Sequence, residues 1–139
     1  MENKEKNTTD ELKDKATKIL NDVKDDSKSF DKKDIDSGKG MAILSYIGIL
    51  ALIPFLSEKK NKFVIYHAKQ GMNLFICEII GSFVIGIVTS ILWRLWFVAN
   101  LIETLYGLAV LALSIIGIVN VCNGKAKELP VINKIKIIK

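Results

Sequence analysis

Four polar side chains interrupt the apolar stretch FVIYHAKQGMNLFICEIIG at residues 63–81, and they are the strongest candidates for chemistry. His67 is the only histidine of the chain, the amides Gln70 and Asn73 follow it, and Glu78 lies deeper among isoleucines. Helical spacing places His67 and Glu78 on one face. A histidine can relay protons or bind metal, and a carboxylate within a membrane helix normally faces protein or a water-filled cavity. The stretch predicts a helix that enters a membrane with polar residues at its mouth.

These side chains are too few for a recognisable catalytic or metal centre. One histidine with two separated cysteines, Cys77 and Cys122, falls short of the ligands of a zinc site. The sequence also lacks a nucleophile–base set and a glycine-rich phosphate loop. We therefore expect no enzyme activity, no metal and no cofactor. We expect His67 at the water interface and the two amides to hold the connection between helices by hydrogen bonds. Glu78 has either a functional role or a structural hydrogen bond to the third helix.

Composition separates a polar tail from an apolar body. The chain has 139 residues, of which 50% are hydrophobic, and a net charge of +5. We expect residues 1–40 to form a charged, partly disordered tail with an amphipathic helix and a flexible joint at 38–40. Residues 41–139 should form one membrane domain. The excess of lysines beside apolar runs favours anionic lipid headgroups as partners. We expect no nucleic-acid partner, because the headgroups explain the basic charge better.

Three apolar runs predict an all-α fold, a bundle of about three transmembrane helices. The spans are expected at residues 41–57, 71–92 and 98–122. The length of each helix, at about 1.5 Å per residue, has to match a hydrocarbon core about 30 Å thick. The first run is short and contains Pro54, so a re-entrant helix is the alternative to a span. The segment 129–139 alternates apolar residues with lysines and is expected at the membrane interface.

Small and aromatic residues predict how the second span packs and ends. Small residues at four-residue spacing, which let another helix approach closely, are Ser82, Gly86 and Ser90. An aromatic belt is expected at the membrane–water interface, formed by Trp93, Trp96 and Phe97 around Arg94. Arg94 is expected to pair with Glu103 across the turn. An antiparallel second and third span would place Cys77 and Cys122 about 10–14 Å apart, too far for a disulfide.

The distribution of lysines predicts the orientation in a bacterial plasma membrane. With three spans, residues 57–70 and the C-terminal tail share a side and carry nine lysines. The positive-inside rule then places the C-terminus of this multi-pass protein in the cytoplasm and the N-terminal tail outside. A re-entrant first helix would bring the N-terminal tail inside as well.

Three segments resemble a family of small bacterial membrane proteins. They are LSYIGILALIPFL at 44–56, FVIYHAKQGMNLFICEIIG at 63–81 and GIVNVCNGKAKELPVINKIKI at 117–137. The family is related to the twenty-kilodalton Tic component of chloroplast inner-envelope protein import and to the magnetosome membrane protein MamF. The resemblance implies an all-helical integral membrane fold. Chloroplast relatives are proposed to help form a protein-conducting passage, and magnetosome relatives affect crystal growth.

Two functions from different classes follow. The first is a structural or assembly protein, without catalysis, whose helices bind lipid, further copies of the chain or other membrane proteins. The alternative is a subunit of an oligomeric channel or protein-translocation pore, with His67, Glu78 and Asn120 lining a polar path. Three helices are too few to enclose a pore, so the alternative requires an oligomer.

Overall fold

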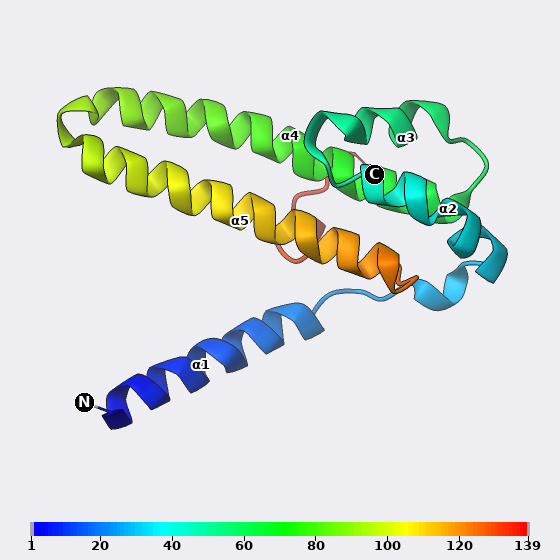
Figure 1. Cartoon of the computed structure of the whole chain (residues 1–139), viewed down its shortest axis with the longest axis horizontal. Helices are drawn as coiled ribbons and strands as arrows, with labels where there is room; N and C mark the ends of the chain where they lie inside the picture. The colour runs from blue at the N-terminus through cyan, green and yellow to red at the C-terminus, as the bar shows by residue number, and fades with distance from the viewer. Residues whose placement is uncertain (1, 139) are drawn as a thin grey trace.

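A hairpin of two long helices dominates the computed structural model, which describes residues 2–138 (Figure 1). Helices α4 (Lys62–Ile91) and α5 (Trp96–Cys122) run antiparallel and contact each other. The shorter α2 (Lys32–Leu44) and α3 (Leu52–Ser57) gather at the open end of this hairpin, and α1 (Glu2–Asn21) extends apart from it. Short 3-10 turns complete the fold at Ser27–Ser29, Gly48–Ala51, Trp93–Leu95 and Ile132–Lys134. The all-α prediction is confirmed.

The two hairpin helices are long and apolar enough to cross a membrane. At 1.5 Å per residue, α4 and α5 are about 45 and 40 Å long. Away from the open end of the hairpin their large apolar side chains are exposed, as Phe83, Ile91 and Leu105 show. A helix that is apolar on its outward faces is the form expected against lipid. Two membrane-length helices are therefore present, and the expected three are not confirmed.

The first apolar run folds back on itself and does not form one continuous helix. Helix α2 ends at Leu44, a turn follows, and a 3-10 turn then leads into α3. Gly48 adopts a left-handed backbone with φ of 47°, which breaks the helical path. Pro54 lies in the first turn of α3, where its missing N–H removes no helical hydrogen bond. The single straight helix expected at 41–57 is therefore replaced by a folded-back segment, and the re-entrant alternative stays a prediction.

Helix α2 passes through Gly38-Lys39-Gly40, so the flexible joint expected there is wrong. A Cβ atom at Gly38 would lie 2.6 Å from Val64 Cγ2, and glycine therefore lets α2 pack closely against the start of α4. Asn61 ties the same two helices together. Its side-chain oxygen caps α4 by accepting from the Val64 N–H at 3.1 Å, and its Nδ2 donates to the Asp34 carbonyl at 2.8 Å.

The N-terminal tail pairs with the C-terminal segment. The Asp26 N–H donates to the Ala126 carbonyl at 2.9 Å, and the Glu128 N–H donates to the Lys24 carbonyl at 3.0 Å. Part of the tail expected to be disordered is thus ordered. The pairing also places both tails at the same end of the hairpin, and the three-span arrangement with the tails on opposite sides is not supported. We call residues 24–74 and 117–138 together the head.

The register of the hairpin corrects the expected cysteine separation. The Tyr106 hydroxyl lies 3.2 and 3.0 Å from the backbone carbonyls of Cys77 and Glu78, which fixes the two helices against each other. Cys122 lies sixteen residues beyond Tyr106, about 24 Å further along α5. The expected separation of 10–14 Å between the cysteines is too short. It assumed that the helix begins at Gly71, whereas α4 begins nine residues earlier at Lys62, which places Cys77 further from the open end of the hairpin.

Candidate functional site

His67 lies inside the head and not at the water interface where the sequence led us to expect it. Its side chain is fully buried, and Nδ1 lies 2.8 Å from the Tyr46 hydroxyl. The rings of Phe63 and Tyr66 pack edge-on against the imidazole, with centroids 4.6 and 5.3 Å away. These contacts make His67 the centre of a buried aromatic cluster in the head.

Two glycines let the turn after α2 wedge between the hairpin helices. A Cβ atom at Gly71 would lie 1.7 Å from the Ser45 carbonyl oxygen, a distance that no side chain can occupy. A Cβ atom at Gly117 would lie 2.4 Å from the Tyr46 ring. Because Tyr46 also reaches His67, this turn joins α4 to α5 at the open end of the hairpin.

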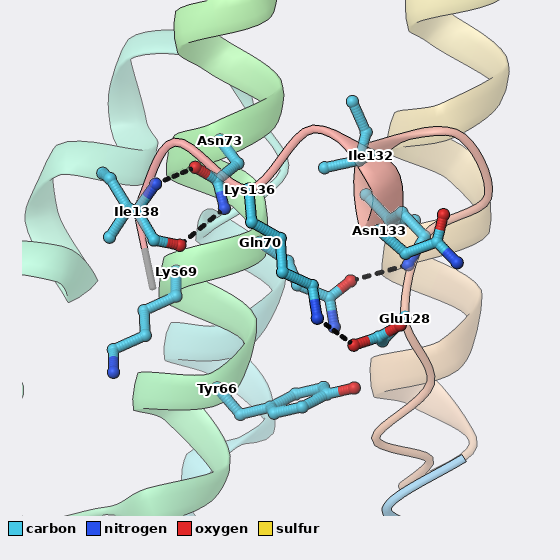
Figure 2. Close-up of a pocket in the computed structure, with 10 residues that line it drawn as sticks. Tyr66, Lys69, Gln70, Asn73, Glu128, Ile132, Asn133, Lys136 and Ile138 are labelled. Carbon is cyan, nitrogen blue, oxygen red and sulfur yellow. Dashed lines mark hydrogen bonds and ion pairs between the residues drawn. The ribbon is translucent and has the colours of Figure 1, made fainter. Parts of the chain in front are cut away.

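Gln70 and Asn73 hold the C-terminal segment against α4 (Figure 2). Gln70 Nε2 donates to the Lys127 carbonyl at 3.1 Å, and its Oε1 accepts from the Leu129 N–H at 2.9 Å. Asn73 bonds both backbone groups of Ile138, its Nδ2 donating at 2.9 Å and its Oδ1 accepting at 2.6 Å. We call these four hydrogen bonds the amide clasp. The amides therefore hold the C-terminal segment, whereas the sequence led us to expect the connection between helices.

Glu78 lies at the junction of the head and the hairpin. It is half-buried and lines a cavity of about 10 Å³, roughly the space of one water molecule, together with Ser45 and Ser114. Asn120 lies near the C-terminal end of α5, where its backbone carbonyl accepts from the Lys125 N–H at 2.8 Å. His67 is closed off by its buried aromatic neighbours, so these three side chains do not line a shared open path within one chain. The channel alternative is not supported.

The small residues predicted to pack a further helix are exposed on α4, and two of them, Ser82 and Gly86, border a groove that α5 also lines. The space around Gly86 is open, and the Ser90 hydroxyl donates to the Gly86 carbonyl of its own helix at 2.6 Å. Ser82 is exposed beside Gly86 and near Glu103. Contact between these residues and another chain stays a prediction.

The turn between α4 and α5 carries the aromatic residues predicted to lie at the interface. Trp93 and Trp96 are largely exposed at this tip. The Arg94 guanidinium lies 6.0 Å from the centre of the Trp93 ring, the geometry of a cation–π contact. The expected pairing with Glu103 is therefore not formed, since Glu103 instead faces a groove beside Tyr106.

Sequence reasoning missed Tyr46 and the pairing between the two tails. Both depend on residues far apart in the chain, 21 positions for Tyr46 and His67 and 99 for Ser27 and Ala126. A signal for Tyr46 was present, because a tyrosine between serine and isoleucine in an apolar run needs a partner for its hydroxyl.

A two-helix apolar hairpin closed by a helical head defines a small helical membrane protein. The family model described as the magnetosome magnetite crystal formation protein family, MamF/MmsF, matches residues 38–138. The chain belongs to this family. Its membership and the two apolar helices together indicate a membrane location.

Individual relatives agree with the family match. Magnetosome protein MamF of Magnetospirillum gryphiswaldense is 32% identical over 95 residues, 68% of this chain and 78% of the relative. Magnetosome protein MmsF of Paramagnetospirillum magneticum is 30% identical over 93 residues, 67% of this chain and 79% of the relative. No solved structure matches the chain. These matches support the magnetosome side of the expected resemblance and do not show the chloroplast side.

Proposed function

We propose that the protein is a structural membrane protein that acts without catalysis in magnetite crystal formation within a magnetosome-type membrane. The family description and the magnetosome relatives support this role. The amide clasp is the observation that carries the structural part. Polar side chains that could have served chemistry at the entry of α4 are engaged with the backbone of the same chain.

The proposed topology has two passes, with the head and both tails on the cytoplasmic side. Pairing between residues 24–27 and 126–128 supports a shared side for the tails. The lysines of the head lie before and on α2, before and at the start of α4, and in the C-terminal segment, whereas the opposite tip carries Arg94. This asymmetry fits the positive-inside rule. The exposed face with Gly86 offers a place for another membrane helix, from a second copy or another protein.

Complementation tests the magnetite role. This chain would be expressed in a magnetosome-forming bacterium that lacks its own MamF and MmsF, and magnetite crystal length would be measured by electron microscopy. We expect the chain to restore crystal length relative to an empty vector. A membrane-inserted chain that leaves the crystals unchanged would contradict the magnetite role.

A clasp variant tests whether the head carries that role. We expect Gln70→Leu with Asn73→Leu to insert in the membrane but to restore crystal length poorly. The matched control is Asn100→Leu, which removes an exposed amide near the opposite tip of the hairpin. Equal restoration of crystal length by the clasp variant and the control would show that the head is not required for crystal formation.

A further inference from the structure

A cavity of about 400 Å³ lies between α4 and the C-terminal segment (Figure 2). Leu129, Ile132 and Ile138 give it apolar walls. The amide clasp also borders it, but those amides are already bonded to the backbone. The cavity is therefore largely apolar, and charged side chains border it at Lys69, Glu128 and Lys136.

Two lysines border this cavity and differ in their partners. Lys136 bonds Glu128 at 2.7 Å, and the Glu128 side chain is largely buried. Lys69 is exposed on α4, and among residues 6–138, whose side chains the structure describes, no carboxylate lies within ion-pairing distance of it. With two cations and one acid at its border, the cavity has a net positive edge that attracts an anion.

The cavity lies at the level where α4 enters its apolar run. Its α4 residues run from Tyr66 to Asn73, whereas the exposed apolar side chains of the hairpin begin at Ile79. Membrane headgroups occupy this level if the hairpin crosses the bilayer. An anion that reaches the cavity from this level is a lipid headgroup.

We propose that the cavity binds the headgroup of an anionic phospholipid. Its phosphate contacts Lys69 and Lys136. The acyl chains continue along the exposed apolar side of α4. This site requires the membrane location but does not depend on the magnetite role.

Lipid binding to the purified full-length protein tests the proposal. The protein in mild detergent would be titrated with phosphatidylglycerol, phosphatidic acid or phosphatidylcholine, and bound lipid would be counted by native mass spectrometry. We expect the anionic phosphatidylglycerol and phosphatidic acid to bind more tightly than the zwitterionic phosphatidylcholine. Equal binding of phosphatidylglycerol and phosphatidylcholine would overturn the proposal. Displacement by free glycerol phosphate at the same concentration as lipid would overturn it too, because the site would then take a soluble phosphate.

Charge-matched variants locate the site. Lys69→Gln with Lys136→Gln should weaken phosphatidylglycerol binding by on the order of tenfold. Lys59→Gln with Lys60→Gln removes the same charge from exposed positions before α4 and should change binding less than about twofold. An equal loss of phosphatidylglycerol binding in both double variants would mean that the lipid is attracted by the general surface charge, and it would overturn the proposed site. Lys69→Gln alone keeps the Lys136–Glu128 pair, so its loss of binding is free of effects on folding.

Discussion

Asn73 holds both backbone groups of Ile138, a residue 65 positions further along the chain. Gln70 makes the same kind of bracket one turn earlier in α4, with Lys127 and Leu129. A side-chain amide that bonds one N–H and one carbonyl replaces the neighbour that an extended segment would have in a sheet. The C-terminal segment is thereby fixed as part of the head.

Loss of one bracket should loosen that segment. Asn73→Leu removes two hydrogen bonds and should destabilise the head by about 1–3 kcal/mol, because backbone groups of Ile138 lose their partners. Trypsin should then cut faster after Lys134 and Lys136, as measured by mass spectrometry of the protein in detergent. The control Asn100→Leu should leave the cutting rate unchanged. A rate for Asn73→Leu equal to that of the control would show that the bracket does not hold the segment.

The close approach of Gly71 to Ser45 predicts a strong response to one added methyl group. Gly71→Ala would place Cβ 1.7 Å from a backbone oxygen, so the turn must move, at a cost of about 1–3 kcal/mol or more. Gly107→Ala adds the same atom to α5 where the space is open, and it should be neutral or stabilising by up to about 1 kcal/mol. Thermal unfolding in detergent compares the two. Equal melting temperatures would show that the turn at Ser45 does not pack closely between α4 and α5.

The buried Tyr46–His67 bond should respond to removal of a single oxygen. Tyr46→Phe keeps the ring against Gly117 but leaves His67 Nδ1 without its partner, at a cost of about 1–3 kcal/mol. The nitrogen chemical shifts of the His67 ring should change at the same time. Unaltered shifts together with wild-type stability would mean that the bond does not form.

Glu58 gives the loop before α4 a dependence on pH. Its carboxylate accepts from the backbone N–H groups of Asn61 and Lys60, each at 3.0 Å, and these bonds lower the pKa of Glu58. A lowered pKa in the folded state means that the bonds stabilise the loop at neutral pH and are lost as pH falls through that pKa. The amide resonances of Lys60 and Asn61 should therefore shift with acidification. Glu58→Gln should abolish that transition, and a transition that persists in this variant must come from another group.

The two cysteines report the register of the hairpin. A separation of about 24 Å along the helix axes between Tyr106 and Cys122 leaves Cys77 and Cys122 beyond the reach of a short bis-thiol linker. We expect spin labels at the native cysteines to show a distance of about 20 Å or more. Efficient crosslinking within one chain by a linker of about 10 Å would contradict this register.

The sequence alone predicted the all-α fold and the two long spans, because apolar runs of this length have few other solutions. It also identified Gln70 and Asn73 as hydrogen-bonding residues at the entry of α4. Their partners could not be predicted, since the C-terminal segment reaches them only after the chain has crossed the hairpin and returned.

The first apolar run shows why local patterns were insufficient. Its composition fits a short span, but the wedge at Ser45 depends on a glycine 26 residues away in α4. The second span was predicted to begin at residue 71, where the continuous apolar run begins, whereas α4 already begins at Lys62. Packing against α2 stabilises that part of the helix, and a hydropathy pattern does not contain this contact.

The side of the membrane on which the two tails lie tests the central claim most directly. In a chain with Cys77→Ser and Cys122→Ser, single cysteines at Lys6→Cys or Lys134→Cys would be labelled with a membrane-impermeant maleimide in intact and inverted vesicles. The two-pass hairpin predicts that both positions react only in inverted vesicles, whose outer surface is the cytoplasmic side. Reaction of one position in intact vesicles and of the other in inverted vesicles would place the tails on opposite sides and contradict the hairpin.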